Sequence, residues 1–231
     1  TQGVPAQIVG GLHPLAAIRL LADRLLAFSP PRLAHPNILL LHASHESTSN
    51  TLDLARALTA HLTPSCTLQE ISLRSGLLMD CRGCSYHVCS QYAVHNRCFY
   101  GGAIPDKVFP AILQADALLL LCPNYNDALS AHITAFINRL TALLIHNNLE
   151  NKYLYAIIVS GYSGGDLVAQ QVLGALSLNK SFMLPPRFCM WETANSPGEA
   201  LQIPGVQNRV RAFGQNIVSA ILSPGPEGPA Q

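Results

Sequence analysis

Four cysteines stand close together in the chain, with the spacing Cys-x2-Cys-x4-Cys-x8-Cys. They are Cys81, Cys84, Cys89 and Cys98. Four thiolates within 18 residues can converge on one tetrahedral ion or one cubane cluster, because both need four soft sulfur ligands in a small volume. His87 and His95 lie in the same segment, so a mixed Cys/His zinc site is an alternative. Thiols that stay free or form disulfides are a third possibility.

A second candidate site is a run of polar side chains between an apolar stretch at 38–41 and a helix-period stretch at 50–62. Its members are Ser44, Ser47, Thr48, Ser49, Asn50 and Thr51. Unpaired N–H groups and the positive dipole end at a helix N-terminus favour an anion, and added hydroxyl donors suit a phosphate monoester. The run contains no glycine, so it is neither a Gly-rich dinucleotide loop nor a Walker loop. A Ser/Thr-rich loop with one capping residue is the alternative.

Two further loops follow apolar runs. The first consists of Pro123, Asn124, Tyr125 and Asn126, and it offers a stiff backbone, amide groups and one aromatic ring. The second consists of Ser160, Gly161, Tyr162, Ser163 and Gly164, in which glycines let backbone amides approach a flat ligand. A turn with a helix cap and an ordinary glycine turn are the alternatives.

The elements that must position these loops alternate along the chain. Short apolar runs at 38–41, 68–73, 117–121, 154–159 and 188–191 predict strands, and amphipathic segments at 50–62, 107–115, 128–146, 166–179 and 205–222 predict helices. Strands this apolar, separated by helices, indicate a parallel sheet covered on both faces. The sequence therefore predicts a three-layer α/β sandwich with a five-stranded parallel sheet. Ligands bind such folds at the carboxyl ends of the strands, which is where the three loops lie.

The two ends of the chain do not follow this alternation of strands and helices. Residues 14–28 have helical spacing and are closed by Ser29-Pro30-Pro31, so residues 1–36 are expected to form a helical extension that packs on the domain or on a neighbour. The sandwich is expected over 37–222. Residues 223–231 are rich in proline and glycine, and we expect them to be a disordered tail.

Taken together, the three loops resemble the NAD(P)H-dependent FMN reductase branch of the flavodoxin-like superfamily over about residues 37–180. The most specific part is the Pro-x-Tyr turn at 123–125 followed by Ala135-Phe136-Ile137-Asn138-Arg139. The resemblance implies that the first loop holds the FMN phosphate, that the second and third loops hold the isoalloxazine ring, and that NAD(P)H is the donor. Members often carry Arg or Lys in the first loop, whereas this chain has His45 and Glu46. Glu46 must therefore point away from a bound phosphate, or the pocket is altered.

The cysteine segment resembles that of the iron–sulfur flavoproteins, a subgroup of the same superfamily whose compact motif follows the second strand. The resemblance implies that Cys81, Cys84, Cys89 and Cys98 bind a [4Fe–4S] cluster. The gaps of four and eight residues are wider than is usual in that subgroup, so the zinc site and the unmetallated thiols stay open. The remaining cysteines, Cys66, Cys122 and Cys189, lie in or beside predicted strands and are expected to be buried, inert thiols.

Composition excludes several classes of protein. The net charge is +1 and the chain contains no basic run. It therefore lacks the clustered positive charge of nucleic-acid-binding proteins, and we expect no nucleic-acid partner. The apolar runs are far shorter than the roughly 20 residues that cross a bilayer, and the N-terminus lacks a signal peptide, so we expect a cytoplasmic protein without a membrane partner. Only 12% of the residues are charged, so part of the surface is expected to be covered in a homo-oligomer, to which the nearly uncharged helix at 128–146 would contribute. Covering of this helix by the N-terminal extension is the alternative.

The functional prediction is an FMN-dependent oxidoreductase whose acceptor is a small molecule or a protein. A non-enzymatic electron carrier is the first alternative, and the near-neutral charge disfavours it because carriers of this superfamily tend to be strongly acidic. A flavin-free zinc-binding module is the second alternative.

Overall fold

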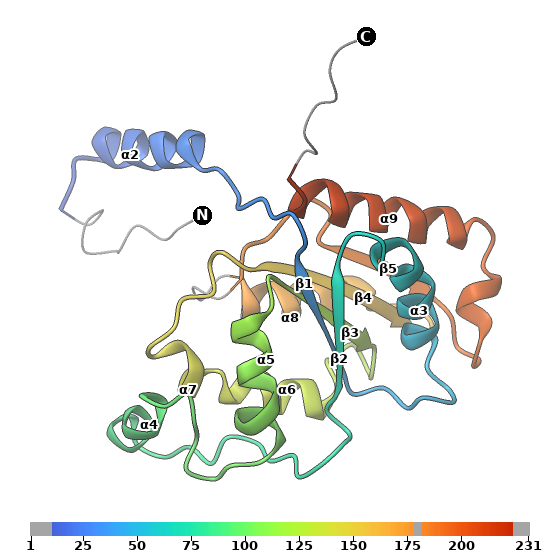
Figure 1. Cartoon of the computed structure of the whole chain (residues 1–231), viewed down its shortest axis with the longest axis horizontal. Coiled ribbons are helices and arrows are strands. Elements are labelled where there is room, and N and C mark those ends of the chain that lie inside the picture. The colour runs from blue at the N-terminus through green and yellow to red at the C-terminus, as the bar shows by residue number, and fades with distance from the viewer. Residues whose placement is uncertain (1–10, 178–181, 224–231) are drawn as a thin grey trace. The chain divides into compact units, whose positions relative to one another are not determined.

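A computed structural model describes residues 11–177 and 182–223. In this part of the chain five strands form one parallel sheet with the order β2-β1-β3-β4-β5 (Figure 1). The strands are β1 (Asn37–His42), β2 (Thr67–Ser72), β3 (Ala117–Pro123), β4 (Tyr153–Ser160) and β5 (Cys189–Thr193). The α/β sandwich and its flavodoxin-like strand order are therefore confirmed.

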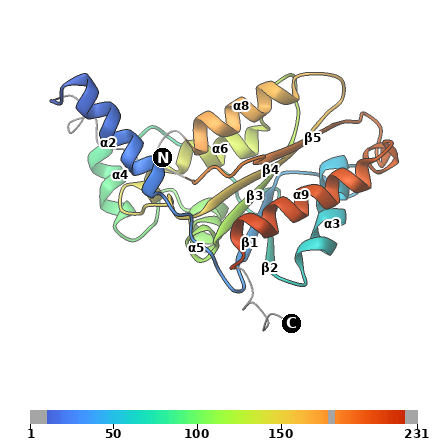
Figure 2. The ribbon, with the colours of Figure 1, turned by 90° about the horizontal axis from the view of Figure 1, so that it is seen from above.

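Helices cover both faces of the sheet (Figure 2). One face packs against α3 (Asn50–Leu62) and α9 (Val206–Ile221). The other face packs against α5 (Phe109–Gln114), α6 (Ala131–Arg139) and α8 (Gly165–Leu176). Alternate residues of β1 serve the two layers, because Ile38 and Leu40 face α3 and α9 whereas Leu39 and Leu41 face the other side. Every residue of β4 is buried, which explains its nearly unbroken apolar sequence.

Some helix boundaries differ from the sequence prediction. The segment 128–146 is divided into α6 and α7 (Thr141–Leu144), because Leu140 N–H bonds to Ile137 O, three residues back, and tightens the chain there. The helix predicted at 107–115 is shorter, and the π-helix Ile104–Val108 precedes it. Two short helices were not predicted, α4 (Tyr86–Ala93) in the cysteine segment and the 3-10 helix Glu199–Gln202 after β5. None of the described helices is long and apolar enough to cross a membrane.

The chain divides into two compact units, Thr1–Pro31 and Arg32–Gln231. The first contains α2 (Pro14–Ala27), the helix predicted near the N-terminus, which has His13 as its cap and a proline at its first position. The covering of this helix by the domain or by a neighbour stays a prediction. The disordered tail predicted from residue 223 onward lies, apart from Ser223, outside the described residues.

A charged pair ties α9 to the edge strand β5. The Arg209 Nε atom lies 2.6 Å from Glu192 Oε1, and Nη2 lies 2.8 Å from Oε2, so the contact is bidentate. The Glu192 side chain is only 7% exposed, whereas that of Arg209 is 45% exposed. The carboxylate beside it holds the pKa of Arg209 above its usual value. The half-exposed guanidinium of Arg209 therefore stabilises the ionised form of the buried Glu192 carboxylate.

Replacing Arg209 with Met leaves Glu192 buried without that cation. We expect Arg209→Met to lower the free energy of unfolding by about 1–3 kcal/mol, measured by urea denaturation at pH 7. Arg211→Met is the matched control, because Arg211 is exposed and makes no ion pair among the described residues. The control is expected to stay within about 0.5 kcal/mol of the parent chain. Equal losses of unfolding free energy in the two variants would show that the Arg209–Glu192 pair does not stabilise the fold.

Candidate functional site

The loops after β1, β3 and β4 lie at one edge of the sheet, because these three parallel strands are neighbours. The topology thus brings together the three loops singled out in the sequence. Asn124 joins the second loop to the third directly. Its Nδ2 donates to Ser160 Oγ at 3.2 Å and to the Ser163 carbonyl at 2.7 Å.

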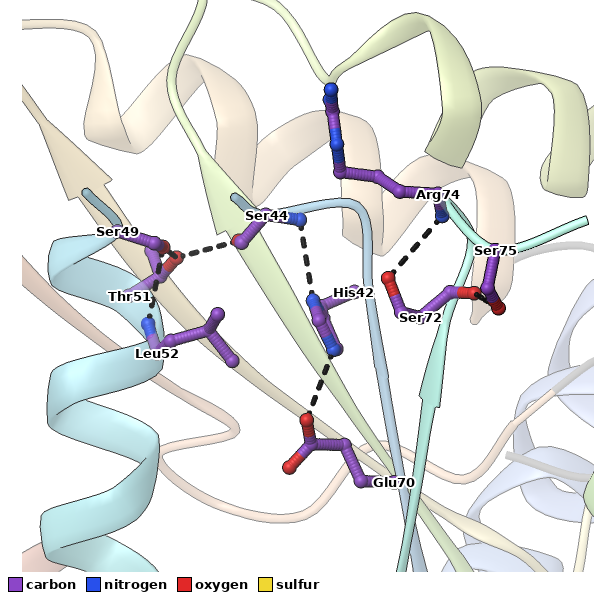
Figure 3. A network of polar contacts seen from close by, with 9 residues as sticks. All are labelled: His42, Ser44, Ser49, Thr51, Leu52, Glu70, Ser72, Arg74 and Ser75. Atoms are coloured by element: carbon purple, nitrogen blue, oxygen red, sulfur yellow. Dashed lines mark hydrogen bonds and ion pairs between the residues drawn. The ribbon is translucent and has the colours of Figure 1, made fainter. Parts of the chain in front are cut away.

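The first loop contains a chain of hydrogen-bonded hydroxyls (Figure 3). Ser44 Oγ lies 3.0 Å from Thr51 Oγ1, which lies 2.7 Å from Ser49 Oγ. Ser49 caps α3, since its Oγ accepts the N–H of Leu52 at 3.2 Å. Ser44 and Thr51 are buried and Ser49 is half-buried. The three hydroxyls are therefore held in fixed positions at the start of the helix.

The start of α3 also leaves N–H groups free. The N–H groups of Asn50 and Thr51 donate to no acceptor within the described ranges. The amide side chain of Asn50 is engaged at both ends, because Nδ2 donates to Ser196 O at 2.9 Å and Oδ1 accepts from Ala200 N at 3.1 Å. Asn50 thus offers its backbone to a ligand and uses its side chain to hold the segment after β5.

The remaining residues of the first loop face water. Ser47 and Thr48 are exposed, and so is Glu46, the carboxylate that departs from the family pattern. A Glu46 side chain in solvent is compatible with an anion at the start of α3, because water screens the repulsion between exposed charges.

The second loop is a tight hairpin. Tyr125 and Ala128 exchange backbone hydrogen bonds of 3.1 and 3.2 Å, and both residues between them have positive φ, 51° for Asn126 and 59° for Asp127. Two consecutive left-handed residues make a type I′ turn, which Asn and Asp tolerate best among residues other than glycine. The turn leaves the Tyr125 ring 54% exposed. Pro123 is the last residue of β3 and is half-buried.

Asn124 carries an unsatisfied polar atom into this site. Its Nδ2 has three acceptors, the third being Asp127 Oδ1 at 3.2 Å. Its Oδ1 is buried and has no hydrogen-bond partner among the described residues. A buried acceptor without a donor costs free energy, so a ligand N–H at this place would be favoured. The flavin ring, which the resemblance places here, carries such a donor.

The third loop gives way to α8 through Gly164, whose φ of 80° is left-handed. A Cβ atom at this position would lie 1.6 Å from Asp127 Oδ1, so any other residue would have to adopt a left-handed backbone and displace the Asp127 carboxylate. Gly161 is also crowded, because a Cβ atom there would lie 3.0 Å from Asn195 Oδ1. Tyr162 is 91% exposed at the tip of the loop.

Sequence reasoning missed two polar residues beneath the first loop. His42, the last residue of β1, is buried, and its Nε2 lies 3.2 Å from Glu70 Oε1 on β2 (Figure 3). The available signal was a histidine that ends an otherwise apolar strand. Its partner comes from a different strand, so spacing along the chain did not reveal it.

The cysteine segment is tethered to α6 at its beginning. Asn138 Nδ2 donates to Asp80 Oδ1 at 2.9 Å, and Arg139 Nη1 donates to Met79 O at 3.3 Å. The Asn138 amide and the backbone N–H of Cys81 together lower the pKa of Asp80 below its usual value.

All seven cysteines are free thiols. Cys81 is exposed, whereas Cys84, Cys89 and Cys98 are half-buried. Burial raises the pKa of Cys89 above its usual value, and the nearby thiols of the other three cysteines raise it further. Across residues 11–177 and 182–223, no group of three or more His, Cys, Asp or Glu side chains is arranged to hold a metal ion. The segment thus gathers four thiols near one another without the geometry of a metal centre.

Of the other three cysteines, all predicted to be buried, two are buried in the structure. Cys66 and Cys122 are buried, and Cys189 is half-buried beside the core. Burial raises the pKa of Cys189 to about 11 and raises those of the other two. A raised pKa disfavours the thiolate, which is the reactive form of cysteine, and the inertness of these thiols stays a prediction.

The crowding at Gly164 predicts a stability defect. Gly164→Ala forces either Asp127 or the backbone to move, and we expect it to lower the free energy of unfolding by about 1–3 kcal/mol. Gly174→Ala is the matched control in α8, because a Cβ atom there has nothing within 4 Å. The control is expected to raise stability by about 0.5–1 kcal/mol, since alanine favours a helix over glycine. Urea denaturation of both proteins checks the pair, and an unchanged Gly164→Ala protein would contradict the prediction.

Several solved structures share this fold. RosB, crystallised with bound 8-demethyl-8-formylriboflavin-5'-phosphate, superposes with a TM-score of 0.62 at 14% identity, over 80% of this chain and 78% of that chain. The NAD(P)H:quinone oxidoreductase of Methanothermobacter marburgensis has a TM-score of 0.56 at 16% identity, over 80% and 100%. An azoreductase of Bacillus anthracis has a TM-score of 0.54 at 15% identity, over 80% and 98%. At these identities the likeness establishes the flavodoxin-like fold.

The sequence itself decides the family. A comparison with curated proteins finds no match. The model of the NADPH-dependent FMN reductase family, however, matches residues 36–196, which include all three loops and the cysteine segment. The chain therefore belongs to the NADPH-dependent FMN reductase family and is an NAD(P)H-dependent oxidoreductase with FMN as its cofactor.

Proposed function

We propose that this reductase holds the FMN phosphate in the loop after β1 and the isoalloxazine ring between the loops after β3 and β4. The observation that carries the proposal is the pair of free N–H groups at the start of α3, set beside the chain of three hydroxyls. Backbone N–H donors, the helix dipole and fixed hydroxyls together bind a phosphate dianion without a cationic side chain. The first loop of this chain contains no Arg or Lys.

The ring site is proposed on different grounds. The unpaired Asn124 Oδ1 accepts from a ring N–H, and the backbone of residues 160–164 approaches the ring closely because Gly161 and Gly164 carry no side chain. When bound, FMN supplies the redox chemistry, accepting hydride from NAD(P)H and reducing an acceptor. The protein therefore needs to orient the ring and keep one side of it accessible, rather than supply a catalytic acid.

The proposed acceptor is a small molecule or a protein that reaches the ring at the exposed rim. Tyr125 and Tyr162 stand on this rim with 54% and 91% of their surface exposed, so two aromatic side chains are available to a flat acceptor. Quinone and azo compounds are acceptors of this shape, and both classes occur in the names of proteins with the same fold. The electron-carrier alternative differs in its donor, because a carrier would be reduced by another protein instead of by NAD(P)H.

We place the enzyme in the cytoplasm as a homo-oligomer. In support of association, the single Lys, Arg, Asp or Glu of α6 is Arg139, and its side chain is 3% exposed and turned inward. The outward side of this helix therefore carries no Lys, Arg, Asp or Glu. Burying it against a second copy would remove no charged side chain of these types from water.

The cysteine segment is proposed to bind a [4Fe–4S] cluster through Cys81, Cys84, Cys89 and Cys98, with zinc or unmetallated thiols as alternatives. The support is the sequence spacing and the proximity of the three other thiols to Cys89. The side chains would have to reorient, because they are not arranged as a metal centre in the structure. A cluster would supply one-electron transfer to a partner, a capacity that hydride exchange alone lacks.

The phosphate site is tested by Thr51→Val, which removes the central hydroxyl of the chain and keeps the shape of the side chain. We expect the dissociation constant for FMN to rise about tenfold, the equivalent of roughly 1.4 kcal/mol, while that for riboflavin, which has no phosphate, changes little. Quenching of flavin fluorescence measures both constants. Thr59→Val is the control, because Thr59 lies farther along α3 and bonds only to its own helix.

Stopped-flow mixing of the FMN-loaded protein with NADH or NADPH then tests the reaction. Rapid bleaching of the flavin by either nucleotide is expected of the reductase. A protein that binds FMN but is reduced only by another protein would be a carrier, and a protein that binds no FMN would contradict the proposal outright.

The metal assignment is tested by anaerobic purification followed by iron, sulfide and zinc analysis. A [4Fe–4S] cluster would give about four iron and four sulfide per chain, and Cys84→Ala would abolish both. Cys66→Ala is the control, because this buried thiol lies outside the segment. One zinc without sulfide would assign a structural site, and neither metal would leave a flavin reductase with free thiols.

A further inference from the structure

His42 lies directly beneath the proposed phosphate loop. It ends β1 and is 1% exposed. Its Nδ1 accepts the backbone N–H of Ser44 at 3.2 Å, and Ser44 is the first member of the hydroxyl chain (Figure 3). The imidazole thus holds the backbone of the residue at which the loop begins.

The hydrogen bond to Nδ1 fixes the tautomer. A nitrogen that accepts a hydrogen bond carries no proton, so the proton of the neutral ring is on Nε2. Nε2 lies 3.2 Å from Glu70 Oε1, within ion-pair distance. It makes no hydrogen bond of regular geometry in the described part of the chain, so its contact with Glu70 is electrostatic. Glu70 is half-exposed on β2, so its carboxylate stays hydrated while it orients the ring.

We propose that His42 is a positioning residue for FMN binding, which as a neutral imidazole fixes Ser44 and thereby aligns the hydroxyls of Ser44, Thr51 and Ser49 with the phosphate. The inference rests on the proposed phosphate site. His42 does not contact the phosphate in this role, because its Nδ1 accepts from Ser44 and its Nε2 faces Glu70. Its effect reaches the ligand only through the loop.

Protonation would break this arrangement. A protonated Nδ1 carries its own N–H, which opposes the N–H of Ser44. Burial lowers the pKa of His42 below its usual value, although Glu70 and Glu46 act in the opposite direction, and Arg56 on α3 lowers it further. On β3, the residue in register with His42 is the apolar Leu121. The ring is therefore neutral at pH 7 and becomes charged only as the pH falls through the lowered pKa.

Two amide variants separate the two nitrogens of the ring. His42→Asn keeps an acceptor where Nδ1 stands and loses the contact with Glu70. His42→Gln keeps a donor toward Glu70 and loses the acceptor for Ser44. The measured quantity is the ratio of the riboflavin and FMN dissociation constants at pH 8, which reports the contribution of the phosphate.

The proposal predicts that His42→Gln lowers this ratio about tenfold, whereas His42→Asn stays within about threefold of the parent protein. A general loosening of the fold would weaken both ligands and leave the ratio unchanged, so such a result would overturn the proposal. Equal ratios in the two variants would also overturn it. Failure of the parent protein to bind FMN is a separate result, since it would refute the proposed function before any variant is compared.

The pH dependence supplies the second readout. Between pH 8 and pH 5 the FMN phosphate itself becomes singly charged, with a pKa of about 6 typical of monoesters, and this affects all variants alike. From pH 8 to pH 5, the ratio of the riboflavin to the FMN dissociation constant should fall at least about threefold further in the parent protein than in His42→Asn. The asparagine side chain cannot titrate, so the additional fall reports protonation of His42. Glu70→Gln, at a half-exposed position, removes the stabilising carboxylate and should move the additional fall to lower pH. Superimposable profiles of the parent protein and His42→Asn would overturn the requirement for a neutral ring.

Discussion

The burial of the inner strands β3 and β4 on both faces of the sheet is the constraint on which the rest of the structure depends. All eight residues of β4 are buried, and neighbouring β3 is buried in all but its last residue. Apolar strands of this kind need helices on each side, and parallel strands joined by such helices place all their carboxyl ends at one edge. The loops that leave this edge are free of the packing demands of the core, so they can carry the polar side chains that a cofactor needs.

The polar groups at this edge are held by one another rather than by the core. The hydroxyls of Ser44, Thr51 and Ser49 form one connected chain, and Asn124 Nδ2 holds the next two loops together by donating to Ser160 Oγ and to the Ser163 carbonyl. Preorganised donors of this sort bind an anion without reorganising, which raises affinity at no cost in loop entropy on binding. The exposed residues Ser47 and Thr48 lie outside this row of bonded hydroxyls, since Ser47 Oγ bonds to the exposed His45 ring instead, so they are less suited to the role predicted for them.

The sequence was informative wherever a pattern had one physical meaning. Buried parallel strands require continuous apolar runs, so all five were located correctly, with β5 extending two residues beyond the predicted end at 191. The apolar period of 128–146 continues through Leu140, so periodicity alone could not detect the break between α6 and α7. Two contacts join residues that are distant along the chain. Asn50 bonds to Ser196 and Ala200, and His42 faces Glu70. Such pairs exist only once the fold is formed, and for that reason the sequence did not reveal them.

Helix α6 connects the cysteine segment with the site proposed for the flavin ring. α6 begins just after the 125–128 hairpin, and its last two residues, Asn138 and Arg139, hold the chain where the cysteine segment begins. Arg139 is buried, and its Nε and Nη2 have no partner among the described residues, so the burial of this cation costs free energy that few of its contacts offset. The favourable ones are the Met79 carbonyl and the charge of Asp80. Displacement of residues 79–80 would remove both contacts. The buried Arg139 charge would then lose its stabilisation, so moving the cysteine segment away from α6 is unfavourable. The position of the thiols is thereby linked to the helix that follows the turn proposed to bind the ring.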